Sequence, residues 1–148
     1  MAFARILVPL DGTKRSATVV SYTTDIATPS KSKVLLLTVL SAPDESFGIA
    51  FGEQGSIGKP GSADEEVVLR EYLDIVAGQL REKGLDVETE IRRGVPSKEI
   101  LQAALEWRCD VIAMTTRANR GLKRLVLGSV AEEVLRICRL PVLLVAPY

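Results

Sequence analysis

A turn at the end of the first apolar run carries an aspartate and a glycine. The stretch VPLDGT, residues 8–13, leads from that run into a helical pattern. The carboxylate of Asp11 can accept hydrogen bonds from a ribose or an amino group. Alternatively, Asp11 or Thr13 only caps the following helix. The sequence leaves both roles open, and Asp11 is a candidate binding residue.

A basic segment, TTRANRGLKRLVLGS at residues 115–129, ends where another helical pattern begins. Free backbone N–H groups and the helix dipole favour an anion at such a position. Gly128 lets a phosphate approach closely, and the Ser129 hydroxyl can donate a hydrogen bond to it. Four basic side chains add positive charge: Arg117, Arg120, Lys123 and Arg124. The alternative is an ordinary serine N-cap beside a solvated basic loop.

A third glycine stands in RRGVPS, residues 92–97, between a predicted strand and a predicted helix. Gly94 permits a left-handed turn or a close approach of the backbone to a ligand. Loop geometry alone is the simpler explanation of this glycine.

Composition narrows the chemistry that these segments can perform. Nineteen basic residues balance nineteen acidic ones, so net charge gives no argument for a nucleic-acid or membrane partner. The chain has no histidine, which excludes histidine-based triads and histidine metal ligands. Cys109 and Cys138 stand in apolar surroundings, and we expect both to be buried, reduced thiols of a cytoplasmic protein. No run is long enough to span a membrane.

Five segments are predicted strands, and four of them are continuously apolar, as in a parallel sheet covered on both faces. The four are Arg5–Pro9, Lys33–Leu40, Asp110–Thr115 and Pro141–Ala146. The fifth, Asp86–Arg92, alternates between apolar and polar residues, which is typical of an edge strand.

Four helical patterns lie between the strands, at Thr13–Thr28, Ala63–Lys83, Ser97–Trp107 and Ser129–Arg139. In them Leu105 and Ile137 fall on stripes that we expect to be buried. The alternation predicts one doubly wound, Rossmann-like α/β domain over residues 1–148. In such a sheet the loops after the strands meet at the carboxyl edge, where ligands bind. The long loop Ser41–Ser62 opens there too, and its position motivates the hypothesis of a lid, while the sequence leaves its role open.

Four stretches of the chain resemble the universal stress protein family. They are VPLDGTKRS near the start, LLLTV in the second predicted strand, RRGVPSKEI after the third, and GLKRLVLGSVAEEVLRICRLPVLLV at the end. The resemblance implies a five-stranded parallel sheet in the order 3-2-1-4-5 with four helices. It also implies a homodimer in which the last strands pair antiparallel, here through Val142, Leu143, Leu144 and Val145. A bare apolar edge strand favours such pairing, unless a helix covers it.

One branch of the family binds ATP, and the resemblance assigns roles to residues of this chain. It implies that Asp11 contacts the ribose and adenine side and that the backbone of Val39 contacts adenine. Gly128 and Ser129 would hold the phosphates. Pro9 and Gly94 would line the pocket.

The family's phosphate loop reads G-x-x-G-x9-G-[S/T], and this chain lacks its first two glycines. Thr115 and Ala118 stand in their places. Thr115 is tolerable if its backbone stays extended, whereas Ala118 costs about 1 kcal/mol if a positive φ is required there. Arg117 and Arg120 can offset part of this loss through charge-assisted hydrogen bonds.

Two functions therefore stay open. The first is a dimeric regulatory protein of the stress response that binds ATP or another adenine nucleotide, with or without Mg²⁺, and is not an enzyme beyond very slow hydrolysis. The alternative is a dimeric scaffold that binds protein partners and keeps a degenerate pocket. A different small anion or a true enzyme is a third, weaker option, because an adenylating or nucleotide-hydrolysing relative would carry a Ser-Gly-Gly loop after the first strand.

Overall fold

The computed structural model describes residues 3–41, 62–116 and 127–146. Strands and helices alternate along these residues. In chain order they are β1 (Arg5–Pro9), α1 (Thr18–Ser30), β2 (Lys33–Leu40), α2 (Ala63–Glu82), β3 (Asp86–Arg93), α3 (Pro96–Trp107), β4 (Val111–Thr115), α4 (Ser129–Ile137) and β5 (Val142–Val145). The predicted strands are confirmed to within one residue at each end.

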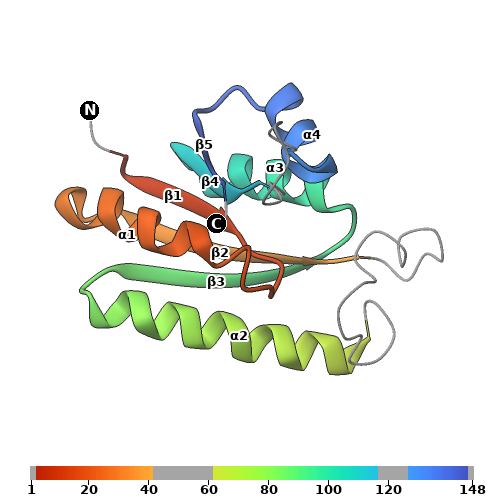
Figure 1. The fold of residues 1–148 in the computed structure, drawn as a ribbon, viewed down its shortest axis with the longest axis horizontal. Helices are drawn as coiled ribbons and strands as arrows, with labels where there is room; N and C mark the ends of the chain where they lie inside the picture. The colour runs from red at the N-terminus through yellow and green to blue at the C-terminus, as the bar shows by residue number, and fades with distance from the viewer. Residues whose placement is uncertain (1–2, 42–61, 117–126, 147–148) are drawn as a thin grey trace.

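The strands form one parallel sheet in the order β3-β2-β1-β4-β5. Helices α1 and α2 lie on one face, and α3 and α4 lie on the other (Figure 1). The fold class, the strand order and the helix number implied by the resemblance are thereby confirmed within the described residues. The switch in strand order falls between β1 and β4, so the loops after these strands diverge around a crevice.

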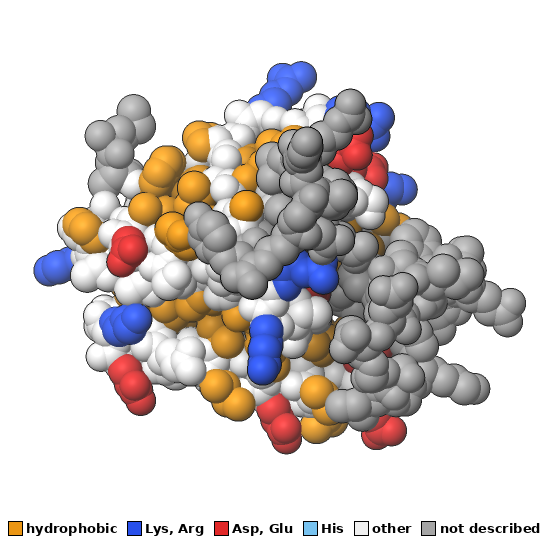
Figure 2. Space-filling view, in the orientation of Figure 1, with side chains coloured by type: hydrophobic (Ala, Val, Ile, Leu, Met, Phe, Trp, Pro, Cys, Tyr) orange, Lys and Arg blue, Asp and Glu red, His pale blue; other side chains and the backbone are white. Residues whose placement is uncertain are grey.

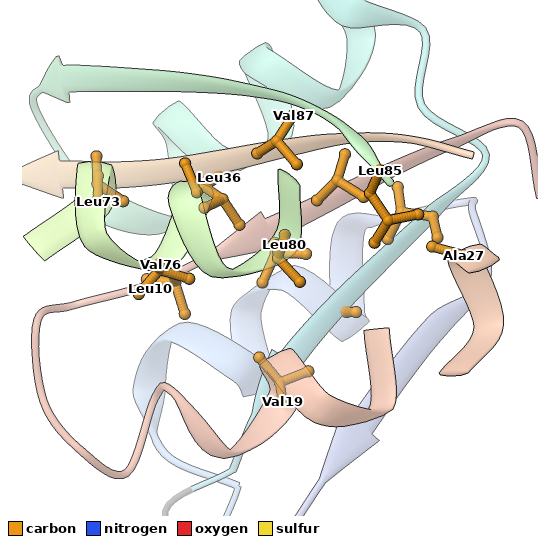
Figure 3. Close-up of a cluster of buried hydrophobic side chains, with 14 of the residues drawn as sticks. Leu10, Val19, Ala27, Leu36, Leu73, Val76, Leu80, Leu85 and Val87 are labelled. Carbon is orange, nitrogen blue, oxygen red and sulfur yellow. The ribbon is translucent and has the colours of Figure 1, made fainter. Parts of the chain in front are cut away.

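Alternate side chains of the strands supply two cores. Val8 and Leu36 face α1 and α2, and Leu7 and Leu37 face α3 and α4. Figure 3 shows the first core, in which side chains of α2 pack toward Leu36 on β2. Because the inner strands are buried on both faces, they read as continuous apolar runs in the sequence.

Helix α1 begins at Thr18, five residues after the predicted start. Residues 14–17 form turns instead. The reason is local hydrogen bonding: the Asp11 carboxylate and the Thr13 hydroxyl accept backbone N–H groups of this segment. Side chains of this kind offer the backbone an alternative to a helix.

The predicted burial of Leu105 and Ile137 is wrong, since their side chains are 73% and 51% exposed. Leu105 lies about 140° around α3 from the buried Ile100, which places it outside the buried stripe. Ile137 is the last residue of α4. Cys109 is buried as expected, whereas Cys138 is only partly so, and both are free thiols.

Charged side chains of both signs are interspersed on the face shown in Figure 2. This distribution matches the balanced composition, and the described side chains on this face form no field of a single sign. Among the described residues, no helix combines the length and the apolar character that crossing a membrane requires.

Candidate functional site

A cleft lies at the carboxyl edge of the sheet, between the ends of β1, β2 and β4 and the starts of α3 and α4. Its apolar part includes Leu37, Ile100 and Met114. Six of the residues predicted from the sequence line it: Pro9, Asp11, Val39, Thr115, Gly128 and Ser129. The structure therefore brings together segments that are more than one hundred residues apart, and their binding role stays a prediction.

The Asp11 turn holds one carboxylate oxygen, and the other has no partner among the residues that the structure describes. Oδ1 of Asp11 accepts hydrogen bonds from the backbone N–H of Thr13 at 2.9 Å and from its hydroxyl at 2.6 Å. Within the described residues, Oδ2 has no hydrogen bond. Since Ala17 is the N-cap of α1 and makes no side-chain cap, Asp11 organises a turn ahead of the helix and is not its cap. This position suits a carboxylate that accepts hydrogen bonds from a ligand.

Ser16 closes the same turn and ties it to β4. Its backbone N–H donates to the Thr13 hydroxyl at 3.1 Å, and its own hydroxyl donates to the Thr13 carbonyl at 3.0 Å. The Asp11 N–H in turn donates to the Ser16 hydroxyl at 3.2 Å. The Thr115 hydroxyl donates to the Ser16 carbonyl at 3.1 Å, which connects the loops after β1 and β4. These bonds fix the geometry of the cleft without a ligand.

Helix α2 braces the turn from outside the cleft. The Tyr72 hydroxyl lies 3.4 Å from both the Ser16 hydroxyl and the Thr13 carbonyl. Burial raises the pKa of Tyr72, which the hydrogen bond with Ser16 opposes. Gly12 has φ +86°, and a Cβ atom there would stand 2.6 Å from Cδ2 of Leu69. The positive φ favours glycine at this position, and a larger residue would displace the Leu69 side chain of α2.

The start of α4 exposes backbone donors to the cleft. Gly128 is the N-cap with φ 80° and ψ 156°, and Ser129 is the first helical residue. The interpretation of Ser129 as an N-cap is wrong, because the cap makes no side-chain hydrogen bond. The first N–H groups of a helix have no partner inside it. They remain free, among the described residues, to bind an anion.

Thr116 carries a buried hydroxyl without a hydrogen-bond partner among the described residues. It is 1% exposed and lines the cleft. Its backbone N–H donates to the Val145 carbonyl at 2.9 Å, which fixes its position beside β5. An unpaired buried hydroxyl costs about 1–3 kcal/mol. A ligand in the cleft that pairs with this hydroxyl would recover that free energy.

Three polar lining residues were not predicted from the sequence: Arg15, Ser16 and Thr116. Arg15 is exposed and forms no ion pair within the described residues. Arg15 and Ser16 stand in the stretch TKRS, and their place beside Asp11 was the only available signal. The sequence had no signal for Thr116, since burial without a partner is visible only in three dimensions.

Of the other three predicted binding residues, one lies outside the cleft and two lie outside the described residues. Gly94 does not line the cleft, whereas Pro96 does, and the role of Gly94 implied by the resemblance stays a prediction. Gly94 has φ +147°, and its position for a Cβ lies 3.0 Å from the Glu99 side chain. Loop geometry therefore explains this glycine. Arg117 and Ala118 lie outside the described residues, as does nearly all of the long loop between β2 and α2.

Solved structures with the same fold include nucleotide complexes. The structure of MJ0577 from Methanocaldococcus jannaschii has a TM-score of 0.75 at 22% identity and covers 100% of this chain and 99% of its own. A universal stress protein in complex with cAMP has a TM-score of 0.66 at 24% identity and covers both chains in full. One from Archaeoglobus fulgidus in complex with dAMP has a TM-score of 0.69 at 19% identity and covers 97% of this chain and 98% of its own. These likenesses show the fold.

Sequence similarity extends over almost the whole chain. Universal stress protein MJ0531 of Methanocaldococcus jannaschii is 32% identical over 143 residues, which are 97% of this chain and 82% of that relative. The model of the universal stress protein family matches residues 2–146. Together with the observed strand order, this match shows that the chain belongs to the universal stress protein family.

Proposed function

We propose that the cleft binds an adenine nucleotide and that this binding serves a regulatory role in the stress response. The observation that carries the proposal is a set of unused polar groups around one apolar cleft. These are the buried Thr116 hydroxyl, the free N–H groups of the α4 start and one oxygen of Asp11. A ligand that combines a ring, a sugar and a phosphate suits a cleft with an apolar lining and such polar groups.

Each part of a nucleotide has a place among these groups. Val39 and the apolar floor accept the adenine, and the backbone of Val39 supplies its polar contact. The Asp11 carboxylate receives the ribose hydroxyls, and the α4 start receives the phosphates. Arg15 adds a cation at the rim. Mg²⁺ would enter with the phosphates and the Ser129 hydroxyl. The cAMP and dAMP complexes of proteins with this fold support a monophosphate as well as ATP.

The proposed role is binding and not turnover. The chain offers no histidine as a general base. We also propose a cytoplasmic homodimer in which β5 pairs antiparallel with its copy. The edge position of β5 and the partial exposure of Val142, Leu143 and Leu144 support this pairing.

The competing function is a dimeric scaffold with a degenerate pocket, and the residues at 115 and 118 favour it. The structure removes half of this argument. Thr115 is the last residue of β4, so its backbone is extended and needs no glycine. The argument from Ala118 stays a prediction from the sequence, because this residue lies outside the described residues.

Isothermal titration with ATP and AMP, with and without Mg²⁺, tests the proposal on the native protein and on Ala118→Gly. Saturable binding near the micromolar range is expected for the native protein. Binding by the Ala118→Gly variant alone would support the scaffold function. The absence of binding by both proteins, with intact thermal unfolding, would contradict the nucleotide site.

A further inference from the structure

A second hollow lies at the opposite, amino edge of the sheet. It is a groove of about 440 Å³ between the C-terminal ends of α3 and α4, which lie side by side on one face (Figure 1). Leu101 and Leu105 of α3 form one side, and Ile137 and Leu140 form the other. The groove shares no lining residue with the carboxyl-edge cleft.

The walls of this groove present apolar surface to solvent. Leu105 is 73% exposed and Ile137 is 51% exposed, although both belong to apolar helix patterns. The thiols of Cys109 and Cys138 also line the groove. Burial raises the pKa of Cys109 to about 11, so this thiol is uncharged at neutral pH. A groove with these walls favours an apolar occupant.

Two arginines stand at this groove, one from each side. Arg108 ends α3, and Arg139 follows α4; both are exposed. Neither forms an ion pair with a carboxylate in the described parts of the chain. By contrast, Arg92 on β3 contacts three glutamates. The charge of the two groove arginines is therefore available to an anion.

Arg108 holds this position in a strained backbone conformation. Its φ of 55° and ψ of 51° are left-handed, where glycine is the usual residue at the end of a helix. The C-cap of α1, Lys31, has nearly the same conformation, with φ 50° and ψ 44°. Lys31 does not line the groove, and it offers a matched control for the backbone effect.

We propose that this groove binds a single-chain amphiphile with an anionic headgroup, such as a long-chain fatty carboxylate. The chain lies between Leu101, Leu105, Ile137 and Leu140. The headgroup pairs with Arg108 and Arg139, because guanidinium groups match carboxylate and phosphate geometry. A volume of about 440 Å³ falls within the range of small-molecule sites, which is roughly 300–1,000 Å³. The size favours a small ligand over a protein segment.

Titration of the full chain with laurate below its critical micelle concentration tests this site. We expect saturable one-to-one binding, and dodecyl phosphate should bind comparably, since both headgroups are anionic. Dodecanol, which has the chain without the charge, should bind about tenfold more weakly or worse. Laurate should also slow alkylation of Cys138, measured by peptide mass spectrometry. Equal binding of dodecanol, or no saturable binding of laurate, would overturn the proposal.

The variant Arg108→Gly separates binding from stability. It removes a guanidinium and relieves the left-handed strain, so its thermal midpoint should not fall while its laurate affinity drops at least about tenfold. Lys31→Gly should share the stability effect and keep the native affinity. Unchanged laurate binding by Arg108→Gly would contradict the assigned headgroup site. Self-association that laurate does not displace and that Leu105→Ser abolishes would show that a second copy covers the groove.

Discussion

The two edges of the sheet carry hollows of opposite character. At the carboxyl edge, polar groups come from the loops after several strands, and the start of α4 at Gly128 lines the cleft. At the amino edge, two helix ends leave apolar walls, and the polar contribution is two arginine side chains. The first combines apolar lining residues with polar groups of the loops and of the α4 start. The second offers an apolar surface and the positive charges of two exposed arginine side chains. Because all five strands run in the same direction, the two edges of the sheet differ: strand-end loops form one hollow and helix ends form the other. One α/β scaffold can therefore present two different kinds of binding surface.

The largest expected effect tests the apolar character of the groove at the amino edge. With a pKa of about 11, Cys109 is a thiolate about a hundredfold less often at pH 8 than a thiol of pKa 9. We expect iodoacetamide to modify it in the native protein at least about a hundredfold more slowly than in the protein unfolded in urea. Peptide mass spectrometry measures both rates, and the partly exposed Cys138 serves as the internal control. Similar rates for Cys109 in the two states would show that the groove floor is open to water.

The next effect tests the backbone cradle at the carboxyl edge. Gly128→Ala places a methyl group at φ 80° and ψ 156°, a region that alanine avoids at a cost of about 1–3 kcal/mol. The start of α4 must shift, and we expect ATP affinity to fall at least about tenfold by titration calorimetry. Gly84→Ala is the control, because Gly84 has φ +85° with open space around it and lies away from the cleft. It should lose comparable stability and no affinity. An equal loss of ATP affinity in both variants would mean that the loss does not come from the start of α4 in particular.

The contact between α2 and the Asp11 turn gives a smaller effect, seen in stability. Gly12→Ala combines a positive φ with a Cβ position 2.6 Å from Leu69, whose side chain can move. We expect the free energy of unfolding to fall by about 1–2 kcal/mol in urea denaturation. Gly78→Ala, inside α2 with nothing within 4 Å, should instead raise it by about 0.5–1 kcal/mol. The same sign for both variants would remove the packing argument for Gly12.

The contrast between the edges also explains what the sequence could reveal. The inner strands were predictable because both of their faces are buried, which leaves an unbroken apolar run. Asp11 and Gly128 could be selected as candidates because glycine and polar residues interrupt the apolar pattern where the strands end at the carboxyl edge. The late start of α1 was not found, since side-chain hydrogen bonds compete there with a helical pattern. The amino-edge groove was hidden for another reason: Leu105 and Ile137 fit a helical period, and periodicity alone does not show which apolar residues a neighbour covers.

The smallest effect comes from Tyr72, which joins α2 to the polar edge through two long hydrogen bonds. Tyr72→Phe keeps the ring and removes these 3.4 Å contacts, so we expect a loss of about 0.5 kcal/mol and about a twofold weaker ATP affinity. Burial raises the pKa of Tyr72, so the neutral form is favoured in the folded state. Its stabilising effect is complete below pH 10 and is lost as the pH rises through the higher folded pKa. The unfolding free energy of the native protein should therefore fall more steeply above pH 10 than that of Tyr72→Phe. Coincident profiles for Tyr72→Phe and the native protein would show that the Tyr72 hydroxyl is not desolvated in the folded state.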